Sequence, residues 1–125
     1  MIPKVVVVGL GPGGADLVMP RALVALRGAP VLVRTERHPA VQELRDAGIE
    51  MLSLDEVYET APDLDAAYAE IVRRVVEAAV FSGSVVYAVP GNPGVAERAV
   101  GKLRVLATAG EIELEIVPGL SFVDI

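Results

Sequence analysis

Turns rich in glycine and proline follow three apolar runs of this chain, and they are the segments best suited to chemistry. They cover residues 9–14, 90–94 and 118–121. Glycine has no side chain, so its backbone amide and carbonyl groups can come very close to a ligand. Open α/β sheets bind ligands outside the carboxyl ends of their strands. The three turns therefore predict one small-molecule site built mainly from backbone.

Composition argues against several other kinds of site. The chain has 125 residues, a net charge of -6, no cysteine and a single histidine, His38. An acidic chain offers no basic face to nucleic acid, and the lack of cysteine excludes disulfides and thiolate chemistry. One histidine argues against a histidine-built metal site. We therefore expect no metal and no nucleic-acid partner for this chain alone.

The ends of the chain and its hydropathy bear on location. The first residues lead directly into an apolar run without the pattern of a signal peptide, and no apolar run is long enough to span a membrane. The sequence predicts a soluble, cytoplasmic protein with no membrane partner. Because the chain stops five residues after Leu120, where a helix is expected to begin, we interpret it as a fragment of a longer polypeptide. A short native protein is the alternative.

Short β-branched runs alternate with longer helical patterns along the chain. The expected strands are 5–8, 31–33, 49–52, 85–89 and 112–117, and the expected helices are 21–26, 40–46, 64–79 and about 94–109. This alternation predicts an α/β fold with an open, mainly parallel five-stranded sheet and helices on both faces. Pro39 and Asp63 are expected where two helices begin, and Gly48 and Gly110 where two helices end. The acidic stretch over 55–65 is interpreted as a solvated face.

The first turn also permits a different interpretation. The G-x-G-x-x-G spacing of a dinucleotide-binding turn is present at Gly9, Gly11 and Gly14. Glu36 then lies where an acidic residue would meet a ribose hydroxyl. Such a turn begins its helix inside the glycine loop, which would place Pro20 in the helix interior at a cost of about 3 kcal/mol. We therefore predict an extended loop over 10–19 and a helix from Pro20, with an NAD(P)-dependent Rossmann oxidoreductase as an alternative.

His38 is the one side chain with a natural pKa for acid and base chemistry near neutral pH. It stands just before Pro39 at an expected helix start, where a histidine more often belongs to the helix entry or to the surface. The sequence shows no partner that would activate it. We therefore assign no catalytic residue from the sequence.

Three motifs in sequence order resemble the marks of the tetrapyrrole (corrin/porphyrin) methylase family. They are Val8-Gly9-Leu10-Gly11-Pro12-Gly13, Val89-Pro90-Gly91-Asn92-Pro93 and Val117-Pro118-Gly119-Leu120-Ser121. Residues 37–41 and 86–98 resemble, more narrowly, the methylase domain fused to MazG-type nucleoside triphosphate pyrophosphohydrolases. The resemblance implies that 1–125 form the N-terminal subdomain of a methyltransferase that uses S-adenosylmethionine, and that the second subdomain is absent from this chain.

The resemblance also implies roles for individual residues. It implies cofactor contacts at Pro90, Gly91, Asn92, Val95, Ser121 and Phe122, and a substrate-side loop at Gly11, Pro12 and Gly13. Gly14 stands where the family usually has an acidic residue, although Asp16 follows two places later. Asn92 stands where the family often has aspartate, and it keeps the hydrogen-bonding shape without the charge.

Three functions follow from these observations. The first is methyl transfer to a small or tetrapyrrole-like substrate, which needs alignment more than an acid and base pair. The second is a non-catalytic module that binds a cofactor or nucleotide and regulates a MazG-type fusion, and the third is the oxidoreductase. We expect apolar surface at the cleft to be covered by a partner, so that the protein is a homodimer or a fused or associated domain.

Overall fold

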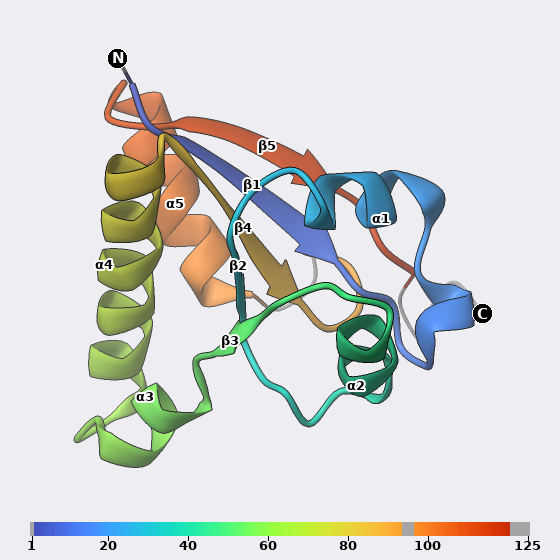
Figure 1. Ribbon diagram of the computed structural model, residues 1–125. Coiled ribbons are helices and arrows are strands. Elements are labelled where there is room, and N and C mark those ends of the chain that lie inside the picture. The colour runs from blue at the N-terminus through green and yellow to red at the C-terminus, as the bar shows by residue number, and fades with distance from the viewer. Residues whose placement is uncertain (1, 94–96, 121–125) are drawn as a thin grey trace.

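Strands and helices alternate along the chain in the computed structural model, which describes residues 2–93 and 97–120 (Figure 1). The strands are β1 (Lys4–Gly9), β2 (Val31–Val33), β3 (Leu52–Ser53), β4 (Ser84–Val89) and β5 (Glu113–Val117). The helices are α1 (Pro20–Leu26), α2 (Pro39–Asp46), α3 (Asp55–Thr60), α4 (Leu64–Ser82) and α5 (Arg98–Thr108), with a 3-10 helix η1 (Ala15–Leu17) before α1.

The five strands form one sheet in the order β3-β2-β4-β1-β5, and every pairing is parallel. β1 pairs with β4 from Lys4 opposite Ser84 to Gly9 opposite Val89, and it pairs with β5 on its other side. Parallel strands covered on both faces are typically continuous apolar runs. The predicted fold class is confirmed.

Alternate side chains of β1 point to opposite faces of the sheet, as in any strand. Val6 and Val8 pack with α1 and α2, whereas Val5 and Val7 pack with α3, α4 and α5. Figure 1 shows α4 and α5 on one side of the sheet and α1 and α2 on the other. The helices on both faces therefore bury the two halves of the core.

Helix boundaries follow the local signals. α1 begins at Pro20, because proline fits the first helical position and needs no hydrogen-bond partner for its nitrogen. The Asp63 carboxylate accepts a hydrogen bond from Ala66 N at 2.8 Å and caps α4. Gly48 and Gly110, which follow α2 and α5, have φ angles of 94° and 79° that favour glycine. These predicted ends are confirmed.

Two elements near the sheet edge differ from the prediction. β3 consists of Leu52 and Ser53 alone, which pair with Leu32 and Val33 of β2. Ile49 and Met51 are buried by side-chain packing instead. The acidic stretch contains the helix α3, which was not predicted. The predicted start of the last helix at 94–95 lies outside the described residues, and α5 is described from Arg98.

α4 is an amphipathic helix that covers one face of the sheet. Its buried side chains are Ala67, Ile71, Val75 and Ala79. Its outer face carries ion pairs of Arg73 and Arg74 with Glu70. Within residues 2–93 and 97–120, no helix is long and apolar enough to cross a membrane.

Truncating the buried face of α4 tests this packing. Ile71 is fully buried, so Ile71→Ala should lower the free energy of unfolding by about 2–5 kcal/mol, through lost burial and a residual cavity. Val80 lies on the same helix with 66% of its surface exposed, so Val80→Ala should change the free energy of unfolding by less than about 1 kcal/mol. Urea unfolding curves give both values. Equal losses in the two variants would contradict this packing.

Candidate functional site

The three glycine turns meet at the carboxyl edge of the sheet. Gly9 ends β1, while Gly91 and Gly119 follow the neighbouring strands β4 and β5. A Cβ atom placed on Gly9 would lie 2.5 Å from the carbonyl oxygen of Gly91 and 2.7 Å from the amide nitrogen of Gly119. Real Cβ atoms essentially never approach so closely. Glycine at this point lets the three turns pack backbone against backbone.

Two of these turns are also hydrogen-bonded to each other. Gly11 N donates to Gly91 O at 3.2 Å, and Gly91 N donates to Gly11 O at 3.0 Å. The φ angles of Gly11 and Gly91 are 75° and 63°, in the left-handed region that favours glycine. Gly11, predicted on the substrate side, therefore directly contacts Gly91, predicted on the cofactor side.

The His38 side chain is hydrogen-bonded to the first turn. Its Nδ1 accepts a hydrogen bond from Ala40 N at 3.1 Å, which caps α2 and assigns the ring proton to Nε2. Nε2 then donates to Gly11 O at 2.6 Å. The ring is buried, with 8% of the residue exposed, and both of its nitrogens are bonded. This is the helix-entry role and not the geometry of a free general base.

The remaining predicted site residues fall into two groups. Pro12, Gly13, Pro90 and Asn92 lie in the same turns as Gly11 and Gly91 and are partly exposed, so a ligand can reach them. The other predicted cofactor residues, Val95, Ser121 and Phe122, lie outside the described residues.

A polar cluster that the sequence analysis did not identify lies beside the end of β4. Arg34 Nε donates to the Tyr58 hydroxyl at 3.1 Å and lies 3.5 Å from Glu97 Oε2. The Glu97 side chain is only 6% exposed, and Tyr87 is fully buried. Within residues 2–93 and 97–120, the Tyr87 hydroxyl and Glu97 Oε1 make no hydrogen bond. In the sequence, this cluster could have been suspected from two charged residues: Arg34 directly after β2 and Glu97 directly before α5.

Burial governs the protonation of this cluster. It raises the pKa of Glu97 above the usual range, against the opposing charge of Arg34. Burial also raises the pKa of the Tyr87 and Tyr58 hydroxyls, so both remain neutral at physiological pH. The cluster therefore contains one guanidinium, one carboxyl group with a raised pKa and two neutral hydroxyls.

The features of the dinucleotide interpretation are arranged differently in the structure. The helix after the first glycine loop begins at Pro20, beyond the loop, as predicted. Glu36 forms an ion pair with Arg45 at 3.1 Å, with its side chain half exposed. In the part of the chain that the structure describes, no three His, Cys, Asp or Glu residues gather in a group that could hold a metal ion.

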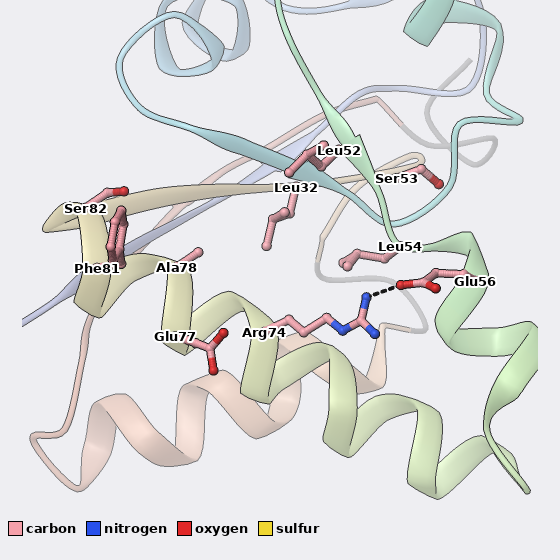
Figure 2. A pocket seen from close by; sticks show the side chains of 10 residues that line it. All are labelled: Leu32, Leu52, Ser53, Leu54, Glu56, Arg74, Glu77, Ala78, Phe81 and Ser82. Carbon is pink, nitrogen blue, oxygen red and sulfur yellow. Dashed lines mark hydrogen bonds and ion pairs between the residues drawn. The ribbon is translucent and has the colours of Figure 1, made fainter.

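A hollow of about 500 Å³ lies away from the turns, between α4 and the strands β2 and β3 (Figure 2). Leu32, Leu54 and Ala78 make its floor apolar, and Figure 2 shows the guanidinium of Arg74 directed at Glu56. None of the predicted site residues lines it. The candidate site is therefore the group of turns at the carboxyl edge and not this hollow.

An open parallel sheet with glycine turns at its carboxyl edge defines a class of α/β ligand-binding domains. The uncharacterized protein YabN of Bacillus subtilis (strain 168) is 37% identical over 125 residues, which are 99% of this chain and 25% of YabN. The uroporphyrin-III-C-methyltransferase of Thermus thermophilus is 29% identical, with a TM-score of 0.68 over 96% of this chain and 49% of that chain. A uroporphyrin-III C-methyltransferase from Thermus thermophilus complexed with S-adenosylhomocysteine is 24% identical, with a TM-score of 0.66 over 94% of this chain and 48% of that chain.

The family model for Tetrapyrrole (Corrin/Porphyrin) Methylases matches residues 4–125. The chain belongs to this family, and the predicted resemblance is confirmed at that level. The chain spans about a quarter of the length of YabN and about half of the length of the solved methyltransferases to which it is similar.

The meeting of the three turns can be tested with two glycines. Gly9→Ala should lower the free energy of unfolding by about 1–3 kcal/mol, because the new methyl group would overlap backbone of two other turns. Gly101→Ala is the matched control, since Gly101 lies within α5 with open space around it. Alanine there should stabilise the protein by about 0.5–1 kcal/mol. Chemical unfolding of both variants checks the contrast, and a tolerated Gly9→Ala would overturn the backbone packing.

The raised pKa of Glu97 predicts a pH dependence. The stability that this group contributes is fully present below its unfolded pKa of about 4.3, and it is lost as the pH rises through the folded pKa. Because glutamine does not titrate, Glu97→Gln should gain in melting temperature relative to the parent protein as the pH rises from about 4 to 7. Melts at several pH values measure the trend, with the exposed Glu113→Gln as control. A decreasing difference would contradict the direction.

Proposed function

We propose that this chain is the N-terminal half of a methyltransferase that uses S-adenosylmethionine, acting on a small or tetrapyrrole-like substrate. The meeting of three glycine turns at the carboxyl edge of β4, β1 and β5 carries the proposal. Membership of the methylase family and the methyltransferases among the similar solved structures support it. S-adenosylhomocysteine in one of those structures supports the choice of cofactor.

The residues present suit this cofactor. S-adenosylmethionine carries an adenine, a ribose and an amino-acid group, which need hydrogen-bonding backbone within close reach. Gly91 has no Cβ and is partly exposed together with Pro90 and Asn92, so a ligand can come close to this turn. We assign cofactor contacts to Pro90, Gly91, Asn92, Val95, Ser121 and Phe122. The 11–13 loop is assigned to the substrate side.

The activated methyl group of the sulfonium supplies the chemistry when the cofactor is bound. The residues of this chain then have to bind, orient and exclude water, and proximity with alignment can account for much of the rate enhancement. A charged acid and base pair at the turns is not required. The second subdomain, which we propose follows in the longer protein, would form the other wall of the cleft. We place the protein in the cytoplasm, as a homodimer or joined to another domain.

A second candidate is a module that binds the cofactor or a nucleotide without turnover, within a MazG-type fusion. Both ring nitrogens of His38 are already hydrogen-bonded, and Gly14 has no carboxylate where the family usually has one. These observations are compatible with binding without turnover. Cofactor affinity without methyl transfer in the full-length protein would support the module, and turnover would exclude it.

The assignment of the turns predicts a contrast between two glycines. Gly91→Val should weaken the binding of S-adenosylhomocysteine by about tenfold or more, since φ at Gly91 is 63° and a β-branched residue resists that conformation. Gly14→Ala should change the affinity less than about threefold, because the new Cβ would meet only the movable ends of the Glu43 and Asp16 side chains.

Isothermal titration calorimetry on the full-length protein measures both affinities, and thermal melts show that each variant is folded. NADH is titrated in parallel. Binding that survives Gly91→Val and is abolished by Gly14→Ala would reverse the assignment of the turns. Together with binding of NADH, that result would favour the dinucleotide interpretation.

A further inference from the structure

Arg34 contacts both ends of the connection between β4 and α5. Its backbone N–H donates to Ala88 O of β4 at 2.9 Å. Its guanidinium, on the same residue, lies 3.5 Å from the carboxylate of Glu97, the residue that precedes the first turn of α5. The segment between Ala88 and Glu97 contains the turn at 90–92 that we assign to the cofactor. Arg34, which directly follows β2, therefore contacts both the strand before this connection and the residue at the start of the helix after it.

The guanidinium is fixed from more than one side. Besides its bond to the Tyr58 hydroxyl, its central carbon lies 5.6 Å from the centre of the Tyr58 ring. Tyr58 in turn packs edge-on against Tyr68 of α4, with ring centres 6.3 Å apart. Tyr58 of α3, which packs against Tyr68 of α4, thus restrains the Arg34 side chain that reaches Glu97.

Stability alone does not account for this arrangement. Removing a carboxylate and a guanidinium from water costs free energy, and replacing a buried ion pair by apolar residues is often neutral or stabilising. The Glu97 side chain is 6% exposed, whereas the Arg34 side chain is 35% exposed, so this cost falls mainly on the carboxylate. Within residues 2–93 and 97–120, Glu97 Oε1 and the buried hydroxyl of Tyr87 make no hydrogen bond of ordinary geometry, although the two side chains interact.

Pinning both ends of a loop reduces the conformations open to the residues between them. A binding turn that is already ordered loses less entropy when its ligand binds. The turn at 90–92 is hydrogen-bonded to Gly11 on one side, and the contact of Arg34 with Glu97 restrains the other. We propose that Arg34 and Glu97 are positioning residues, which hold this turn in the geometry that binds the cofactor. The cofactor's identity rests on the proposed function.

Substitutions in the full-length protein separate positioning from folding. Arg34→Met and Glu97→Gln each break the pair, and the double variant Arg34→Met/Glu97→Leu replaces it by apolar side chains. Arg98→Met is the matched control, because Arg98 adjoins Glu97 but forms only an exposed ion pair with Asp65. Melting temperature, hydrogen–deuterium exchange of the peptide containing Gly91, and calorimetry with S-adenosylhomocysteine are measured for each.

Both single variants should bind S-adenosylhomocysteine about tenfold or more weakly, and exchange at the Gly91 amide should be faster. The double variant should recover the melting temperature of the parent protein while its affinity stays low and its exchange stays fast. Arg98→Met should leave affinity and exchange unchanged. Recovery of affinity together with melting temperature in the double variant would overturn the inference, as would single variants with unchanged exchange and affinity.

The same measurements distinguish this inference from the proposed function. If the parent protein fails to bind S-adenosylhomocysteine, the proposed function is wrong. Exchange at Gly91 then decides the positioning role by itself, since it requires no ligand. Fast exchange in both single variants and in the double variant supports the role, and exchange equal to that of the parent protein refutes it.

Discussion

The close approach of three strand ends is the constraint on which the rest of this domain depends. Gly9, Gly91 and Gly119 pack backbone against backbone, in a space that a single methyl group would overfill. Such contact requires β1 to lie between β4 and β5, with all three carboxyl ends at one edge. Parallel neighbours in turn require crossovers through helices, which cover both faces of the sheet. Strand order and layering are therefore linked to the geometry of the site.

A site made from backbone depends on the side chains behind it. The turns carry no charge of their own, and their carbonyl and amide groups are useful only where they are held in place. His38 fixes the first turn through the carbonyl oxygen of Gly11. Arg34, with Glu97, spans the connection that contains the second turn. In the positioning role that we propose, the ionisable groups near this edge hold backbone in place, which suits the alignment required by the proposed function.

Most of the fold could be predicted because it follows from short-range rules. A β-branched apolar run between breakers forms a buried strand, and Pro20 can begin a helix but not occupy its interior. The third strand and the helix α3 were the exceptions. β3 covers only Leu52 and Ser53, and Ile49 and Met51 are buried without pairing. Burial of apolar side chains therefore does not by itself fix the extent of an edge strand, which depends on its context in the sheet.

For the candidate site, the sequence by itself determined where glycine and proline stand, and thus which turns can approach a ligand. Only the tertiary structure decided that Gly11 pairs with Gly91 and that Arg34 reaches Glu97. It also decided that the His38 ring caps α2 and bonds the carbonyl oxygen of Gly11. The reason is the range of the forces involved. Backbone sterics act within a few residues, whereas a contact between distant residues exists only once strand order and helix packing have brought them together.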